Sequence, residues 1–428
     1  MIIKNFNRII LFGLFLITLF PIYFFVLPTV VWQMIYSIVP FIYLLLCCPY
    51  NRIVNYIMKN NSWYISVMLL LAGVIYAFVI TGFLSGEYSY FEKIVLLFRG
   101  IIQFLAIGVF IERNFYGNLL FKFSTYYVYV TVFYVLCSCV FLFDLPLRSV
   151  WLTLINENNN TAHAFSLVEQ AGEYVTRFGL IGYSGFSCTM ICSLGVLLWI
   201  CFCKRVDIKI WIAMLLILLL GNMFYGRSGL ILSLFLVVIF QLHSVEWKSL
   251  LKIMFYLVPM LIIIFVILGE FVEGDYITYW MNWVLSPMNA FLAGLEKGEF
   301  SLGSSGNVML NMYFLPDSDW TIMFGDGEYK NSDGSYYGHT DVGLMRMILF
   351  GGLFNLICFY GSFVLLLLAI YNTYNNTNRF VLFYISLLAC VFFEIKGDAL
   401  HNYYGLFFAI LYIISSMKNT NMNEMRNK

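Results

Sequence analysis

Long apolar segments recur from one end of the chain to the other, separated by shorter stretches that carry most of the charge. The segments are continuously apolar and do not alternate with a period of two, which favours membrane-spanning helices over barrel strands. Because a helix needs roughly 20 apolar residues to cross a bilayer, about twelve spans can be placed. They cover residues 8–27, 30–48, 63–84, 91–111, 119–143, 181–203, 208–225, 228–242, 249–271, 341–370, 380–395 and 401–417.

Two connections between these spans are much longer than the others, residues 144–180 and 272–340. The eighth span is short, and the tenth is long enough to tilt or to begin outside the membrane. The pattern predicts an all-α polytopic membrane protein, with residues 1–428 forming a single integral membrane domain. Long loops on one side of such a protein are where a site facing that compartment would be assembled.

Composition agrees with this class. Hydrophobic residues make up 62% of the chain, aromatic residues 19% and charged residues 11%, whereas a soluble domain carries about 25% charged residues. This excludes an ordinary soluble enzyme, and we expect the lipid bilayer and no nucleic acid among the partners.

The basic residues predict the orientation. If the N-terminus is cytoplasmic, every second connection faces inward, and these connections hold most of the basic and few of the acidic residues. The inward connections carry Arg52, Lys59, Arg113, Lys122, Lys204, Arg205, Lys209, Lys248, Lys252 and Arg379, and the C-terminal tail adds Lys418, Arg426 and Lys428. Both termini are therefore predicted to be cytoplasmic, and both long loops external.

Four cationic residues then fall on the external side at or near membrane depth: Arg177, Arg227, Arg346 and Lys396. Snorkelling to the interface or pairing with an acid would explain such residues structurally. Lys396 has Glu394 and Asp398 close in sequence, whereas Arg177 and Arg227 have no acid within several residues. Four cations on one face suggest an anionic ligand, and guanidinium groups match phosphate oxygens in bidentate fashion. We expect these four residues to bind a diphosphate.

His339 is a candidate general base, because imidazole titrates near neutral pH. If the tenth span begins near it, His339 and Arg346 share one helix face. Alternatively, Thr340 or Asp341 caps that helix, and the two interpretations are compatible. His401 is external as well, although a packing role fits it better. Asp341, Glu394 and Asp398 are further candidates for the base.

Metal and cofactor sites are not predicted. The acids of the second long loop, including Asp326 and Glu328, lack the spacing of an EF-hand and are explained as solvated acids and turn formers. None of the ten cysteines is in a zinc-site spacing with histidines. The aromatic residues of this loop could stack on sugar rings or pack the loop onto the membrane.

Three motifs carry a resemblance to a known family: "GRSG" at 226–229, "FGDG…HTDVGLMRMILFGGLFN" at 324–355 and "FFEIKGDALHNY" at 392–403. Together with the predicted topology, they resemble the Wzy-type O-antigen polymerases of bacteria and, more distantly, the O-antigen ligases. The resemblance implies a GT-C-like fold in the cytoplasmic (inner) membrane. It also implies an inverting, metal-independent glycosyltransferase that joins undecaprenyl-diphosphate-linked repeat units into O-antigen or capsular polysaccharide, without a cofactor.

The resemblance places the arginines that hold the diphosphate on Arg177 and Arg227, with Arg346, and the histidine that activates the acceptor hydroxyl on His339. It implies a lipid-linked glycan as donor and as acceptor, and a chain-length regulator and a flippase as further candidate partners. One feature departs from the family: the second long loop contains no arginine. An O-antigen ligase, a repeat-unit flippase or transporter, and a structural scaffold stay open as alternatives.

Overall fold

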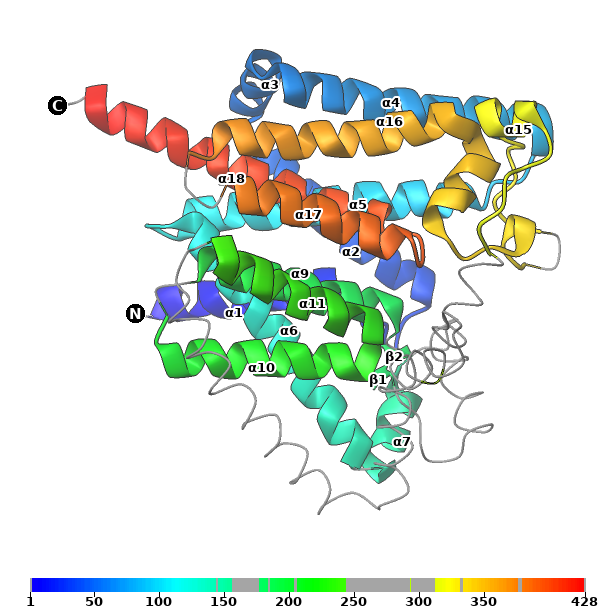
Figure 1. Ribbon diagram of the computed structural model, residues 1–428. Helices are drawn as coiled ribbons and strands as arrows, with labels where there is room; N and C mark the ends of the chain where they lie inside the picture. Colours follow the sequence, from blue (N-terminus) through cyan, green and yellow to red (C-terminus); the bar gives the residue numbers. More distant parts are fainter. Residues whose placement is uncertain are drawn as a thin grey trace. The chain divides into compact units, whose positions relative to one another are not determined.

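The computed structural model of the protein describes residues 2–143, 145–155, 177–183, 185–203, 206–243, 293, 312–331, 334–375 and 379–426 (Figure 1). The ninth predicted span, 249–271, and most of both predicted long loops lie outside these residues.

Apolar helices dominate the described part of the chain. Seven are long and apolar enough to cross a membrane: Thr29–Cys47, Asn61–Ser85, Tyr90–Asn114, Leu119–Phe141, Ile208–Tyr225, Gly343–Thr373 and Leu400–Lys418. Shorter apolar helices cover Asn5–Leu19, Phe186–Phe202 and Arg227–Phe240. All overlap predicted spans, although the first helix ends at Leu19, before the predicted end at residue 27. The prediction of a helical, polytopic membrane protein is therefore confirmed, while the total of twelve spans and the loop arrangement stay predictions.

The chain divides into two compact units, each built from two separate stretches of sequence. The first unit consists of residues 1–36 and 121–305, and the second of residues 37–120 and 306–428. Two helices, α2 (Thr29–Cys47) and α6 (Leu119–Phe143), begin in one unit and end in the other.

The first unit packs short apolar helices around α9 (Phe186–Phe202), which contacts both α10 (Ile208–Tyr225) and α11 (Arg227–His243). These three helices lie side by side in Figure 1. The interior of this unit is aromatic: the side chain of Trp199 is fully buried, and its indole N–H donates to the carbonyl of Trp211 at 3.0 Å. The other elements of the unit are α1 (Ile2–Leu19), α7 (Leu145–Leu154) and the antiparallel pair β1 (Phe178–Gly179) and β2 (Gly182–Tyr183).

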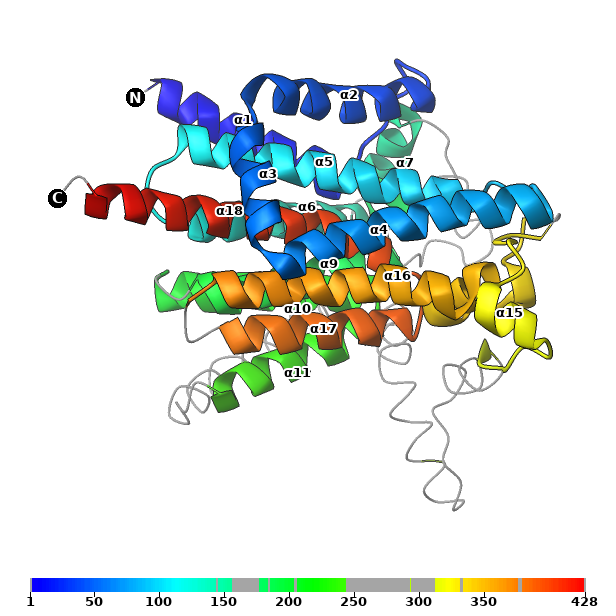
Figure 2. The same cartoon turned by 90° about the horizontal axis from the view of Figure 1, so that it is seen from above.

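The second unit is built on two close helix pairs. In one, α4 (Asn61–Ile80) lies along α16 (Gly343–Thr373), where Ser66 and Ser362 each donate to the other's backbone carbonyl at 2.7 Å (Figure 2). In the other, α5 (Tyr90–Asn114) packs on α18 (Leu400–Arg426), and Gly405 lies directly against the backbone of Gly100. Small residues and interhelical hydrogen bonds allow such approach inside a membrane.

Four shorter helices and one longer one complete the second unit. They are α3 (Tyr50–Lys59), the π-helical turn η1 (Thr81–Ser85), α15 (Asp319–Phe324), the 3₁₀ turn η2 (Tyr337–His339) and α17 (Arg379–Glu394). Large apolar side chains such as Phe83 and Leu46 remain exposed on this unit, as expected for helices whose outer faces meet lipid.

A break in α16 fixes the loop that precedes it. Gly352 has φ 65° and ψ −169°, and the freed carbonyls of Leu349 and Phe350 accept from the backbone N–H groups of Asp326 (2.8 Å) and Gly327 (2.9 Å). Gly325 also has a positive φ of 79°, and a side chain at either Gly325 or Gly352 would overlap the backbone of the other segment. The loop thereby satisfies the polar groups that the broken helix exposes.

Candidate functional site

The first unit holds two of the predicted arginines. Arg177 precedes β1 with a left-handed φ of 69°, and Arg227 is the first residue of α11. Both side chains are half-buried, and their charges interact electrostatically. The structure thus places Arg177 and Arg227 near each other, and their binding of one anion stays a prediction.

The glycines beside Arg227 explain the "GRSG" motif structurally. The backbone N–H of Gly226 donates to the carbonyl of Asn222, and that of Gly229 to the carbonyl of Gly226, each at 3.0 Å. Side chains at Gly226 or Gly229 would collide with Thr189 of α9. The turn between α10 and α11 is therefore pressed onto α9, and this packing holds the start of α11, and with it Arg227, in a fixed place.

The second unit holds Arg346, which lies in the first part of α16 between two tyrosines of the preceding loop. Its guanidinium carbon is 3.5 Å from the ring centroid of Tyr336 and 4.2 Å from that of Tyr329. Arg346 is only 5% exposed, and its Nε and Nη2 have no hydrogen-bond partner among the described residues. A buried guanidinium that is stacked but lacks acceptors for two of its nitrogens can receive an anion.

Asp398 is the centre of the polar network beside this arginine. Its carboxylate accepts from the Tyr329 hydroxyl at 2.7 Å, pairs with His401 Nδ1 at 2.8 Å and with Lys93 Nζ at 3.4 Å. Burial raises the pKa of this carboxyl, but the charges of His401, Lys93 and Arg346 outweigh it and hold the pKa well below its ordinary value. Asp398 is therefore an anion that orients Tyr329 against Arg346.

His401 is enclosed by its partners. It is 3% exposed, its Nδ1 faces Asp398, and its Nε2 lies 3.2 Å from the Tyr90 hydroxyl. Both ring nitrogens are thus engaged inside the unit, which agrees with the packing role expected from the sequence and leaves no nitrogen for a substrate in this arrangement.

Glu394 has a structural environment as well. It is 2% exposed and accepts from the Tyr360 hydroxyl at 2.7 Å, from the Ala399 backbone N–H at 2.8 Å and from the N–H of Leu400. Its carboxyl oxygens satisfy the first amides of α18, which have no partner within the helix. Lys396, the fourth predicted cation, is exposed in the turn between α17 and α18.

His339 lies outside the helix that carries Arg346. The helix α16 begins at Gly343, whereas His339 ends the 3₁₀ turn η2 with a left-handed φ of 53°. The two residues therefore do not share a helix face, because the helix starts later than that interpretation required. Thr340 Oγ1 accepts from the Val342 N–H at 3.3 Å, which makes a turn ahead of the helix. The N-cap of α16 is Val342, without a side-chain hydrogen bond, so the prediction that Thr340 or Asp341 caps this helix is wrong. His339 and Asp341 are both exposed.

The acidic loop is tied down by contacts that the sequence did not reveal. Glu87, which precedes α5, accepts from the backbone N–H groups of Tyr329 (3.1 Å) and Lys330 (3.4 Å). Asp326 accepts from Thr321 at 2.7 Å and from the Tyr337 hydroxyl at 3.0 Å. Burial, and after it the hydrogen bond to Asp326, raise the pKa of Tyr337 to about 12. Asp326 was predicted to be a solvated turn former; it is instead an acceptor within the loop.

Sequence reasoning also missed Tyr329, Tyr336, Lys93 and Tyr90 as neighbours of the candidate site. Lys93 and Tyr90 come from a segment remote in sequence from the "HTDVGLMR" motif. Tyr329 and Tyr336 lie shortly before that motif, but no periodic spacing relates them to Arg346. The one available signal was the aromatic density of the loop. In the described part of the chain no group of three or more His, Cys, Asp or Glu residues could hold a metal ion.

No family model, curated protein or solved structure matches this chain. The fold and the site define a class only: a polytopic, predominantly helical membrane protein that keeps a buried, stacked guanidinium beside an Asp–His pair.

Proposed function

We propose that this protein is a Wzy-type polymerase that joins undecaprenyl-diphosphate-linked repeat units at the outer face of the bacterial cytoplasmic membrane. The resemblance of its motifs supports the family. The observation that carries the proposal furthest is Arg346, whose buried guanidinium has two nitrogens without an acceptor among the described residues. Such a group is costly to keep unless a ligand uses it.

In the proposed reaction, a hydroxyl of the acceptor repeat unit attacks C1 of the donor sugar from the face opposite the diphosphate. The C1–O bond to the diphosphate breaks, the new glycosidic bond forms with inversion, and undecaprenyl diphosphate leaves. Preorganised cations stabilise the charge that develops on the leaving group, because they need not reorganise as the bond breaks. Arg346 takes this role in the second unit. Arg177 and Arg227 of the first unit, and Lys396, stay sequence-based candidates for the diphosphate.

The hydroxyl proton needs a base. His339 fits this role better than His401, because His339 is exposed while the ring of His401 is held by Asp398 and Tyr90. An imidazole on the loop surface can accept the proton directly from a bound glycan. Asp341, exposed beside it, is the alternative base.

The test is a reaction of the purified protein with a lipid-diphosphate repeat unit, run with a chelator and resolved on a gel. A ladder of products spaced by one repeat supports the polymerase. If folded protein given the repeat unit of its own strain makes no ladder, the proposal fails. Transfer of glycan only after lipid A core is added would identify a ligase. Movement of repeat units across vesicles without bond formation would identify a flippase.

A further inference from the structure

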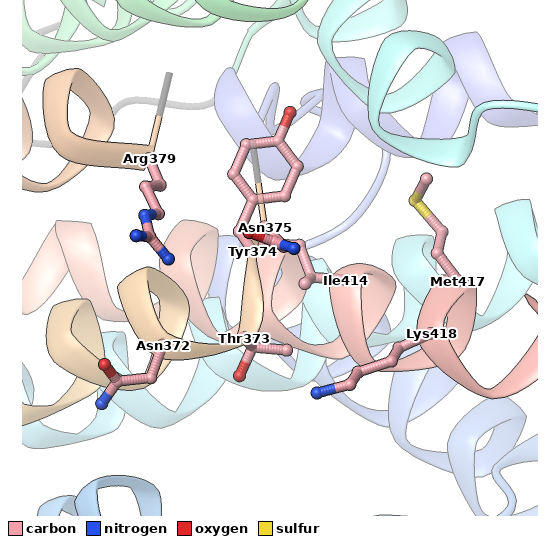
Figure 3. Close-up of a pocket in the computed structure, with 8 residues that line it drawn as sticks. All are labelled: Asn372, Thr373, Tyr374, Asn375, Arg379, Ile414, Met417 and Lys418. Carbon is pink, nitrogen blue, oxygen red and sulfur yellow. The ribbon is translucent and has the colours of Figure 1, made fainter. Parts of the chain in front are cut away.

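A cavity of about 460 Å³ lies in the second unit, away from Arg346, at the other end of α16 (Figure 3). It is bordered by the last turn of α16, the start of α17 and the last apolar turns of α18. The lining residues are Asn372, Thr373, Tyr374, Asn375, Arg379, Ile414, Met417 and Lys418.

The charge in this cavity is positive. Arg379 and Lys418 enter it from different helices, and in Figure 3 Thr373 and Tyr374 lie between them. No lining residue is acidic, and among the described residues neither cation forms an ion pair with a carboxylate. Two cations that share a cavity without an acid make a site for an anion.

The guanidinium of Arg379 is held in position. Its central carbon is 4.9 Å from the ring centroid of Tyr371, which lies in the last turn of α16. Arg379 is also the first residue of α17, so the positive end of the dipole of that helix lies at the same place. The arginine can then present its planar fork to phosphate oxygens.

The other lining residues form a polar side and an apolar side of the cavity. Asn372 and Asn375 supply polar groups on the α16 side, and Thr373 Oγ1 is anchored by Asn60 Nδ2 at 3.4 Å and by the Ala369 carbonyl at 2.7 Å. Ile414 and Met417 supply an apolar wall from α18. A ligand with a phosphate head and an apolar body fits this division better than inorganic phosphate does.

The cavity lies where candidate membrane spans end, since Gly343–Thr373 and Leu400–Lys418 are two of those spans. It is therefore at the depth of lipid headgroups, and the basic residues predict that this end is cytoplasmic. Anionic phospholipids are recognised by such basic pockets between helices on the cytoplasmic side. We propose that Arg379 and Lys418 bind the phosphate of an anionic phospholipid, with its acyl chains along Ile414 and Met417. This site is independent of the proposed glycosyl transfer.

The experiment is native mass spectrometry of the full-length protein with equal amounts of phosphatidylglycerol and phosphatidylcholine. We expect at least tenfold more bound phosphatidylglycerol for the wild-type protein, and loss of this preference in the Arg379→Gln/Lys418→Gln variant. The matched control is Lys209→Gln, which removes an exposed lysine on the same predicted face but outside the cavity, and it should keep the preference. Arg379→Lys keeps the positive charge but lacks the planar guanidinium group, so this variant should bind phosphatidylglycerol to an intermediate extent.

Four results would overturn the proposal. One is equal retention of both lipids by the wild-type protein. The second is an unchanged preference in the double variant, and the third is an equal loss of preference in Lys209→Gln. The fourth is displacement of phosphatidylglycerol by glycerol phosphate at equal concentration, since the site would then take a free phosphate and not a lipid. If the double variant does not fold, Arg379→Lys and Lys209→Gln decide: equal preferences in these two also contradict the assignment.

Discussion

Replacing Arg346 by methionine should leave the fold intact and stop glycan extension. Two of the guanidinium nitrogens are buried without an acceptor among the described residues, and each such group costs about 1–3 kcal/mol. Stacking on Tyr329 and Tyr336 returns about 0.5–2 kcal/mol per ring. The two contributions are of similar size, and methionine fills a similar volume without polar atoms. Asp398 loses the charge of Arg346 but keeps its contacts with His401 and Lys93. The free energy of unfolding should therefore change by less than about 2 kcal/mol.

The comparison is Asp398→Asn, which removes the charge that pairs with His401 and Lys93. Removing one charge of a buried ion pair leaves its partner without a counter-charge, which typically costs about 3–5 kcal/mol. This variant should therefore be clearly less stable than Arg346→Met. Thermal unfolding in detergent measures both variants, and the repeat-unit ladder measures activity. If Arg346→Met were destabilised as strongly as Asp398→Asn, Arg346 would be a structural residue, and the reasoning from its unpaired nitrogens would be refuted.

Further predictions concern the helix break, the carboxylate, the first unit and the orientation. Gly352→Ala should lower the free energy of unfolding by at least about 1–3 kcal/mol, because its backbone conformation is nearly restricted to glycine and a side chain there would overlap the backbone of Met323. Gly13→Ala, with open space around it, is the control in the same thermal-unfolding assay. The pKa of Asp398 is depressed in the folded protein, so its charge stabilises the fold fully above the unfolded pKa of about 3.9. This stabilisation is lost as the pH falls toward the folded pKa. The unfolding temperatures at pH 6 and pH 3 should therefore differ less in Asp398→Asn than in the wild type. Arg227→Ala should insert normally but yield no ladder, and normal polymer from that variant would contradict its role. A fluorescent protein fused after Lys428 should fluoresce in intact cells, whereas a fused periplasmic phosphatase should be inactive.

Much of the helical framework could be predicted because crossing a bilayer demands long apolar segments whatever their contacts. The predicted spans 119–143 and 208–225 coincide with α6 and α10. The break in α16 could not be predicted, because it depends on Gly325 reaching Gly352 from another segment. A purely local pattern therefore gave one uninterrupted span at 341–370.

The sequence could indicate which residue types belong to the candidate site, but not how they are arranged in space. Charge at membrane depth singled out Arg346, since such a group is costly in any fold. Its position between Tyr329 and Tyr336 follows from a loop that is anchored by Glu87 and by the broken helix, and those contacts have no sequence signal. His339 was also singled out by its residue type, as a candidate base. It was expected to share a helix face with Arg346, but α16 begins only at Gly343, so the two residues do not share one.

The central claim is that Arg346 receives a diphosphate. The most direct measurement is the binding of undecaprenyl diphosphate to the purified full-length protein, compared between the wild type and the folded Arg346→Met variant. We predict at least a tenfold weaker affinity for the variant, since one charge-assisted hydrogen bond contributes about 1.5–3 kcal/mol and tenfold corresponds to about 1.4 kcal/mol. Equal affinity in the two proteins would contradict the claim.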